Sequence, residues 1–339
     1  MKKVKVAIIG FGGIARTHNT AYHELIESGF PVEVVAICDK DASRFQTVTT
    51  SNLGTETTPI PQNAKIYTDI DELLVKSDFD MADICLPSFL HKEISCKMMR
   101  AGKHVLCEKP MAHSSAECEE MIRVSYETGK KLMVGQCLRF DSSYLFLKEC
   151  IDSKKYGPLR NLFMDRLSAY PKWGADKWYE STEKCGGCIL DTHIHDIDMA
   201  RFLLGEPELA SAIAYDNISR WQVVNTRLFY KDITVIANAS WDESYTIPFH
   251  MGFRARFEKA SVVLDGDVLT VYPNDAEPFV PDTPKTNRIA EEIRCIVNMI
   301  LDEKFENKEN TSESAYQSIK LIEALRRSVA LGGERVVLI

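Results

Sequence analysis

The chain has 339 residues, of which 45% are hydrophobic and 27% charged, and its formal net charge is -8 at pH 7. This length exceeds what one hydrophobic core usually supports, so we expect two domains. The acidic balance, with a sequence pI near 5.6, argues against nucleic acid and against an anionic membrane as partners, because both bind basic surfaces.

The N-terminal apolar run ends at Gly10, which is too early for the hydrophobic region of a secretion signal. No later stretch approaches the ~18 consecutive apolar residues of a membrane-spanning helix. We therefore expect a cytoplasmic protein. In that compartment its ten cysteines should be reduced thiols.

A dinucleotide motif follows the first predicted strand. The run VKVAII leads directly into GFGGIA, the pattern GxGxxA, and a helix is predicted from about Ile14. Gly10 permits the tight turn, Gly12 lets the backbone approach a pyrophosphate, and Ala15 lets the helix pack on the strand. The motif predicts that phosphates bind at this helix N-terminus, beside Gly10, Gly12, Gly13 and Ile14.

Asp39 ends the second predicted strand, VEVVAIC. An acidic residue at this point can accept hydrogen bonds from both ribose hydroxyls of an adenosine, and it repels a 2′-phosphate. It therefore favours NAD over NADP. Lys40 leaves NADP open, since a cation there could bind the phosphate. The alternative is that Asp39 merely caps a helix beginning at Ala42.

Further strands and helices alternate up to Gly135, which predicts a doubly wound parallel sheet. One strand, His104 to Cys107, ends at Glu108-Lys109-Pro110, where proline stops the hydrogen-bond ladder. Ligands bind beyond the carboxyl ends of such strands. Lys109 is therefore a candidate for catalysis, and a surface salt bridge with Glu108 is the alternative.

After Gly135 the pattern changes to alternating strands with few helices between them, and two helices near the C-terminus. This predicts a second, α+β domain with a large mixed, mostly antiparallel sheet. We expect the domains to be 1–136 and 137–339. If helices leave one sheet face open, that face should make a homodimer or homotetramer.

The densest polar cluster is CGGCILDTHIHDID, residues 185–198. Cys185 and Cys188 suggest zinc, but no second CxxC exists. His193 and His195 suggest a metallohydrolase, but on a helix they lie about 200° apart. The third interpretation pairs Asp191 with His195 at i and i+4 of a helix, where a carboxylate orients a general base. Alternatively, Asp191 caps that helix and His195 packs in the core.

Four stretches together resemble the Gfo/Idh/MocA oxidoreductases: GFGGIA, Asp39, GKHVLCEKP and GGCILDTHIHDIDMARFLLG. The stretches RFDSSYLFLKECID and HDIDMARFLLG resemble the inositol 2-dehydrogenase-like members. The resemblance implies a Rossmann domain and an open-sheet domain. It also implies that Lys109, Asp191 and His195 act together at the nicotinamide. Cys188 and Ser88 depart from the family pattern, where glycine and asparagine are common.

We expect NAD to lie across the glycine turn, with its nicotinamide side lined by Pro87, Ser88, His91, Glu108 and Lys109. His195 would take the proton of a substrate hydroxyl, Lys109 would stabilise the alkoxide, and Asp191 would orient the pair. Arg139 and Trp173 are further expected substrate contacts. No metal is expected.

The expected reaction is oxidation of a hydroxyl of a polyol or sugar, inositol-like, to a ketone by hydride transfer to NAD. An aldose or keto-sugar dehydrogenase or reductase of the same family is the first alternative. A non-catalytic protein that senses a dinucleotide or a sugar is the second. The sequence does not identify the substrate.

Overall fold

The computed structural model describes residues 2–46, 58–172 and 175–338. The chain forms two compact units. The first comprises Met1–Ala112, Ala116–Cys137 and Thr286–Tyr316, and the second comprises His113–Ser115, Leu138–Lys285 and Gln317–Ile339. This differs from the expected division at residue 136, because a C-terminal segment returns to the first unit.

The first unit is built on a parallel six-stranded sheet of order β3-β2-β1-β4-β5-β6. The order reverses between β1 and β4, which is where such sheets bind ligands. The strands are β1 (Val4–Ile9), β2 (Val32–Cys38), β3 (Lys65–Tyr67), β4 (Met81–Ile84), β5 (His104–Glu108) and β6 (Leu132–Gly135). The helices are α1 (Gly13–Glu27), α2 (Ile70–Lys76), α3 (His91–Arg100), α4 (Ser115–Thr128) and α9 (Arg288–Leu301). The predicted doubly wound sheet is confirmed.

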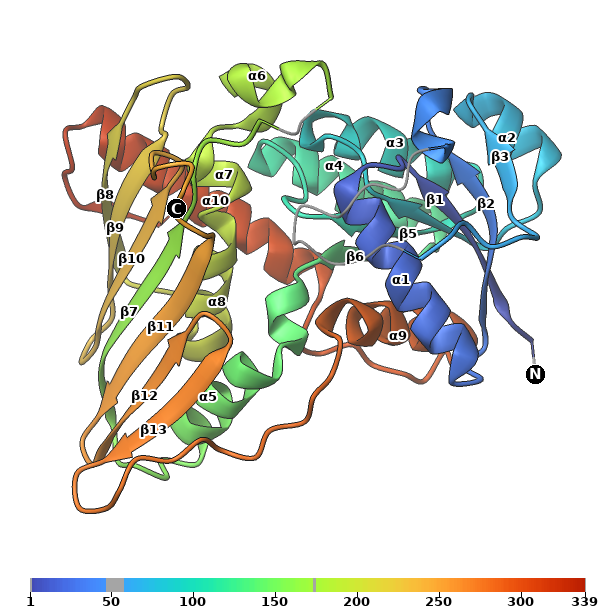
Figure 1. Ribbon diagram of the computed structural model, residues 1–339. Helices are drawn as coiled ribbons and strands as arrows, with labels where there is room; N and C mark the ends of the chain where they lie inside the picture. Colours follow the sequence, from blue (N-terminus) through green and yellow to red (C-terminus); the bar gives the residue numbers. More distant parts are fainter. Residues whose placement is uncertain (1, 47–57, 173–174, 339) are drawn as a thin grey trace. The chain divides into compact units, whose positions relative to one another are not determined.

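Helix α9 explains the revised division. It lies beside α1 (Figure 1), and its buried residues belong to the same hydrophobic core as those of β1 and α1. Its apolar side recurs at helical spacing and comprises Ile289, Ala290, Ile293, Ile296 and Val297. An amphipathic pattern shows that a helix needs a partner surface but not which surface, so the sequence did not place α9.

The second unit contains an eight-stranded sheet of order β13-β12-β11-β7-β10-β9-β8-β14. Among the described strands of this sheet only β7 and β10 pair in parallel, so the predicted mixed, mostly antiparallel sheet is confirmed. The strands are β7 (Leu159–Leu167), β8 (Leu209–Tyr215), β9 (Val223–Phe229), β10 (Thr234–Ser240), β11 (His250–Phe257), β12 (Ala260–Asp265), β13 (Val268–Pro273) and β14 (Val336–Val337). The helices are α5 (Ser142–Asp152), α6 (Thr182–Cys185), α7 (Cys188–Asp191), α8 (Ile194–Leu204) and most of α10 (Ser312–Ala330), whose residues up to Tyr316 belong to the first unit.

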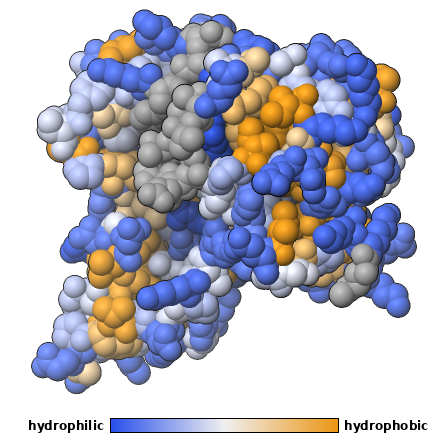
Figure 2. Space-filling view, turned by 45° about the vertical axis from the view of Figure 1, so that its right-hand side comes forward, coloured by the Kyte–Doolittle hydropathy of each residue, from blue (hydrophilic) through white to orange (hydrophobic). Residues whose placement is uncertain are grey.

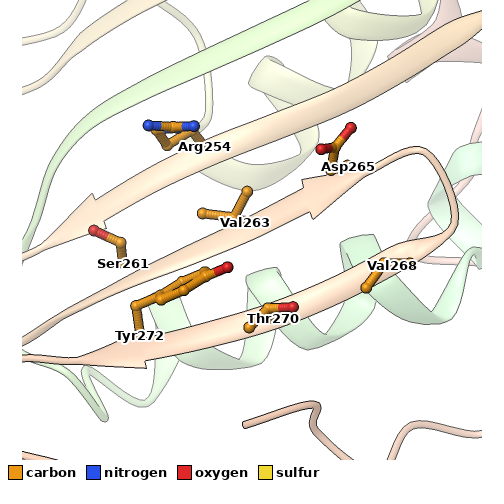
Figure 3. Close-up of a pocket in the computed structure, with 7 residues that line it drawn as sticks. All are labelled: Arg254, Ser261, Val263, Asp265, Val268, Thr270 and Tyr272. Carbon is orange, nitrogen blue, oxygen red and sulfur yellow. The ribbon is translucent and has the colours of Figure 1, made fainter. Parts of the chain in front are cut away.

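Helices α7 and α8 pack on one face of this sheet (Figure 1). Burial alternates along the strands, so every second side chain faces away from those helices. On the opposite face, β11, β12 and β13 form a hollow (Figure 3) that is lined by Arg254, Ser261, Val263, Asp265, Val268, Thr270 and Tyr272. The predicted open sheet face is therefore present in this unit.

The surface seen in Figure 2 is mostly hydrophilic, and its apolar residues gather in a few patches. No helix within the described residues combines the length and apolar character that a membrane crossing requires. The ten cysteines are all free thiols, as predicted.

Candidate active site

The glycine turn after β1 has no room for a side chain at its first position. Gly10 has a φ of +86°, and a Cβ added there would lie 2.6 Å from the carbonyl oxygen of Cys85. The Gly10 N–H also donates to Cys38 O at 2.8 Å. Only glycine combines this conformation with this close approach, so the predicted role of Gly10 in the turn follows from the geometry.

Helix α1 begins at Gly13, directly after this turn. Its N-cap, Gly12, provides no side-chain cap, and the first turn holds no acidic residue. The first N–H groups of a helix lack intrahelical acceptors and carry partial positive charge. The N-terminus at Gly12, Gly13 and Ile14 therefore suits an anionic pyrophosphate, and the residues present fit a dinucleotide cofactor.

Asp39 lies just beyond the carboxyl end of β2. Its Oδ2 accepts the N–H of Phe11 in the glycine turn at 2.7 Å, and its Oδ1 accepts the N–H of Asp41 at 2.9 Å. The interpretation of Asp39 as a helix cap is wrong, because Asp41 caps the following 3-10 helix (Ala42–Phe45) through a bond from the Ser43 N–H. Asp39 instead ties the glycine turn to the carboxyl end of β2, and its expected contact with a ribose stays a prediction.

The turn after β5 contains Lys109 and Pro110 and is called the lysine turn. Contacts of Pro110 fix its position. The peptide bond between Lys109 and Pro110 is cis. The buried ring of His91 lies 2.8 Å from Pro110 O through Nδ1 and 2.9 Å from Leu86 O through Nε2. Burial lowers the pKa of His91. His91 thus ties the lysine turn to the loop after β4, where Pro87 caps the 3-10 helix that begins at the buried Ser88.

Glu108 does not lie on the surface, so the alternative of a surface salt bridge with Lys109 is wrong. The residue is 6% exposed. Oε1 lies 2.9 Å from Nε2 of His18, and Oε2 accepts the Lys109 N–H at 3.1 Å. The Glu108 carboxylate thus faces the buried His18, and its expected place on the nicotinamide side stays a prediction.

Asp191 and His195 lie in the second unit, and the single helix predicted for them is interrupted. Helix α7 ends at Asp191 and α8 begins at Ile194. The break is fixed by two contacts: Trp241 Nε1 donates to Thr192 Oγ1 at 2.7 Å, and His193 Nε2 lies 2.8 Å from Thr226 Oγ1. Asp191 and His195 therefore do not lie on one continuous helix, which the predicted i and i+4 stacking required.

The other cluster residues have structural contacts. Burial lowers the pKa of His193 to about 3, so its ring is neutral near pH 7. The Cys185 thiol donates to Tyr179 O at 3.3 Å. Among the described residues, every group of three side chains close enough to share a metal ion contains His18, and none contains Cys185, Cys188 or His193.

Arg139 makes a buried ion pair with Asp198. Its Nε and one Nη donate to the two carboxylate oxygens at 2.8 and 2.6 Å, and Arg139 is 3% exposed. This bidentate pairing accounts for much of the guanidinium's hydrogen-bonding capacity. Its expected substrate contact stays a prediction. Trp173, the other expected substrate contact, lies outside the described residues.

Two family models match this chain. The model described as "Oxidoreductase family, NAD-binding Rossmann fold" matches residues 4–136, and the GFO/IDH/MocA C-terminal domain matches residues 144–263. The chain belongs to the Gfo/Idh/MocA oxidoreductase family. Its first unit is the NAD-binding Rossmann fold of that family.

Curated relatives in this family include dehydrogenases of polyols and sugar derivatives. The chain is 29% identical to the inositol 2-dehydrogenase of Salmonella typhimurium over 206 residues, which are 60% of this chain and 55% of the relative. It is 29% identical to the D-glucoside 3-dehydrogenase of Escherichia coli over 215 residues, 62% of this chain and 57% of the relative. The matches thus span little more than half of each relative.

A solved structure with the same fold is the aldose-aldose oxidoreductase of Caulobacter crescentus complexed with glycerol. It shares 22% sequence identity with this Gfo/Idh/MocA chain and has a TM-score of 0.84, covering 99% of this chain and 100% of the other. This likeness concerns the fold.

Sequence reasoning missed three buried residues beside the lysine turn of this Gfo/Idh/MocA protein: His18, Asp83 and Glu292. Each left a signal. Asp83 interrupts the apolar strand MADI, and Glu292 falls on the apolar side of α9, three residues after Ile289. Buried charged groups are rare unless they are paired, so such positions can be recognised in a sequence as candidates for a buried network.

Proposed function

We propose that this chain is an NAD-dependent dehydrogenase that oxidises a hydroxyl of a polyol or sugar to a ketone. Its membership of an oxidoreductase family with an NAD-binding Rossmann fold carries this proposal. The names of the inositol and glucoside dehydrogenases among its relatives support a CH–OH substrate. An inositol-like polyol is the substrate class we favour.

In this proposal the substrate hydroxyl is bound by Lys109 and His195. His195 accepts the hydroxyl proton, the Lys109 ammonium stabilises the developing alkoxide, and Asp191 orients the histidine. NAD, when bound, supplies the hydride acceptor. The anchoring of the Lys109 turn by Glu108 and His91 supports this role, because a catalytic cation must be held in one geometry.

A screen of NAD reduction tests the reaction and the coenzyme together. The full chain is assayed with inositols, aldoses and glucosides, first with NAD and then with NADP. We expect turnover with NAD, and a kcat/KM at least about tenfold lower with NADP, because one repelled charge is worth on the order of 1.4 kcal/mol. Asp39→Asn should bring the kcat/KM values for NAD and NADP closer together, while it keeps an acceptor for the Phe11 N–H.

Asp41→Asn is the matched control for this coenzyme test, since Asp41 caps the neighbouring 3-10 helix. Asp41→Asn should leave the ratio of kcat/KM with NAD to kcat/KM with NADP unchanged. Equal use of both coenzymes by the unaltered chain would contradict the role of Asp39. No reduction of either coenzyme with any substrate of the panel would contradict the dehydrogenase itself.

We further propose that a second copy of the chain covers the open sheet face, as a homodimer or a homotetramer. Support comes from large apolar side chains that are exposed on these strands: Phe163 (39%), Ile213 (59%), Tyr215 (63%), Val268 (58%) and Tyr272 (45%). A monomer rarely exposes an extended apolar patch. The partner would therefore bury surface that water otherwise contacts.

Light scattering coupled to size exclusion should give a mass that is a multiple of the 38.4 kDa chain. Phe163→Asp, on the central strand β7, should shift it toward 38.4 kDa. Val75→Asp is the control, because Val75 is 85% exposed on α2 of the first unit. A monomeric unaltered chain would exclude this assembly.

A further inference from the structure

A histidine on α1 connects two buried carboxylates of the parallel sheet. Nδ1 of His18 lies 2.9 Å from Oδ2 of Asp83 on β4, and Nε2 lies 2.9 Å from Oε1 of Glu108 on β5. The exposed fractions are 0% for His18, 0% for Asp83 and 6% for Glu108. The ring therefore joins one helix to two neighbouring strands.

Both ring nitrogens of His18 face acceptors. An ionised carboxylate can only accept hydrogen bonds, so a ring bonded to two carboxylates must donate from both nitrogens, and only the imidazolium does so. Burial lowers the pKa of His18, but the charge of Asp83 and the bond to it prevail, and the pKa lies well above its usual value. The ring is therefore a buried cation between two anions.

Asp83 is the fixed end of this arrangement. Besides His18, the Tyr22 hydroxyl donates to its Oδ2 at 3.0 Å, and the Cys85 thiol contacts its Oδ1 at 3.6 Å. Three donors from α1 and the region of β4 thus hold one carboxylate. His18 is consequently oriented by a rigid partner, which is what gives a ring a single defined position.

Glu108 is the end that reaches the lysine turn. While Oε1 contacts His18, Oε2 accepts the backbone N–H of Lys109 at 3.1 Å. On the other side, a Cβ on Gly135 of β6 would already lie 3.1 Å from Oε1, so β6 lies close against this carboxylate. The Glu108 side chain therefore has little freedom once His18 holds it.

Glu292 of α9 completes the surroundings. It is fully buried and lies close to His18 and Glu108, and neither of its carboxylate oxygens has a hydrogen-bond partner among the described residues. Burial, followed by the charge of Glu108, raises its pKa well above the usual value, so it is neutral. The negative charges next to His18 are then those of Asp83 and Glu108. The positive charge of Lys109 lowers the pKa of Glu108, and that of Arg288 on α9 lowers the pKa of Glu292.

We propose that His18 is a positioning residue: its ring ties Glu108 to Asp83 and thereby fixes the backbone of the Lys109 turn. The proposal rests on the proposed function, because it concerns the lysine assigned to the alkoxide. His18 contacts no reacting atom in this account. It acts through Glu108, and its loss lets the lysine turn move.

The first test follows the His18 ring by nitrogen NMR in the full chain, with histidine selectively labelled. We expect both ring nitrogens to be protonated at pH 8, and Glu108→Gln to shift the titration of His18 to lower pH because one anion is removed. A His18 ring that is neutral at pH 7 in the unaltered chain would overturn the proposal. This measurement requires no substrate.

The second test is kinetic. His18→Gln should lower kcat with myo-inositol or methyl β-D-glucoside by about 10²-fold, the effect of misplacing a reacting group by about 1 Å. The dissociation constant for NADH should change by only a few fold. Glu108→Gln, which keeps an oxygen for the Lys109 N–H, provides a second variant if His18→Gln does not fold, and its kcat should also fall. An unchanged kcat in a folded His18→Gln or Glu108→Gln protein would overturn the proposal.

His104→Gln is the matched control. His104 lies at the opposite end of β5, where its Nδ1 accepts the Lys131 N–H at 3.0 Å, and burial lowers its pKa to about 4. This variant should keep kcat. The proposed function and the positioning role of His18 can be contradicted separately. An active Lys109→Met protein would count against the proposed function. The titration of the His18 ring would still show whether His18 is the cation that joins Glu108 to Asp83.

Discussion

Replacing Lys109 with methionine is expected to reduce turnover on the order of 10³-fold, the cost of removing one preorganised group that stabilises a developing oxyanion. Methionine preserves the length of the side chain but cannot carry charge. NAD affinity should change by only a few fold, because the glycine turn lies between β1 and α1 and Asp39 lies just beyond β2. Steady-state kinetics and NADH fluorescence titration measure the two effects.

Lys103→Met is the matched control for this substitution. Lys103 precedes β5, at the end of the strand opposite to Lys109, and its ammonium donates to Phe79 O at 2.7 Å. Its loss should lower stability slightly and leave kcat unchanged. Substantial turnover by Lys109→Met would remove Lys109 from the mechanism, and an equal loss in both variants would show a general effect of removing charge.

Removing the Asp198 carboxylate should have the largest effect on stability. Asp198 accepts two bonds from Arg139 and one from the Ser318 hydroxyl at 2.6 Å, and it is 1% exposed. Asp198→Ala leaves a buried guanidinium without its counter-charge, which costs about 3–5 kcal/mol. The free energy of unfolding in urea measures this loss, with attention to two-state behaviour in a chain of two units.

Asp152→Ala is the comparison for the Asp198 variant. Asp152 ends α5 and pairs with Lys148 one helical turn earlier, with 59% of its side chain exposed. Exposed pairs of this kind contribute about 0.3–0.5 kcal/mol. If Asp198→Ala were no more destabilising than Asp152→Ala, the ion pair with Asp198 would not account for the burial of Arg139. That result would favour the predicted substrate contact of Arg139.

The buried network beneath the lysine turn shows why local patterns missed part of the site. The glycine motif and the strand end at Lys109 are contiguous in the sequence, so spacing alone identifies them. His18, Asp83, Glu108 and Glu292 come from α1, β4, β5 and α9. Their proximity depends on strand order and on the return of α9 to the first unit, which no local spacing encodes.

The interrupted helix after Asp191 has a similar cause. Local periodicity favoured one helix, since residues 188–204 have helical apolar spacing. A hydrogen bond from Trp241, on the loop after β10, to Thr192 and one between His193 and Thr226 of β9 interrupt that helix. Tertiary contacts override helix propensity because each residue's propensity is worth well under 1 kcal/mol.

The sequence by itself determined the class of both sheets, the glycine turn, the acidic end of β2, the position of Lys109 at a strand end, and the family resemblance that the comparisons confirmed. These features depend on short-range spacing, on apolar periodicity and on glycine conformation, which are local properties. Only the tertiary structure decided that Glu108 faces inward to His18, that Arg139 pairs with Asp198, and that α9 packs against α1. Each of these depends on which partner meets a buried charge or apolar face, and that choice is made by the packing of distant segments.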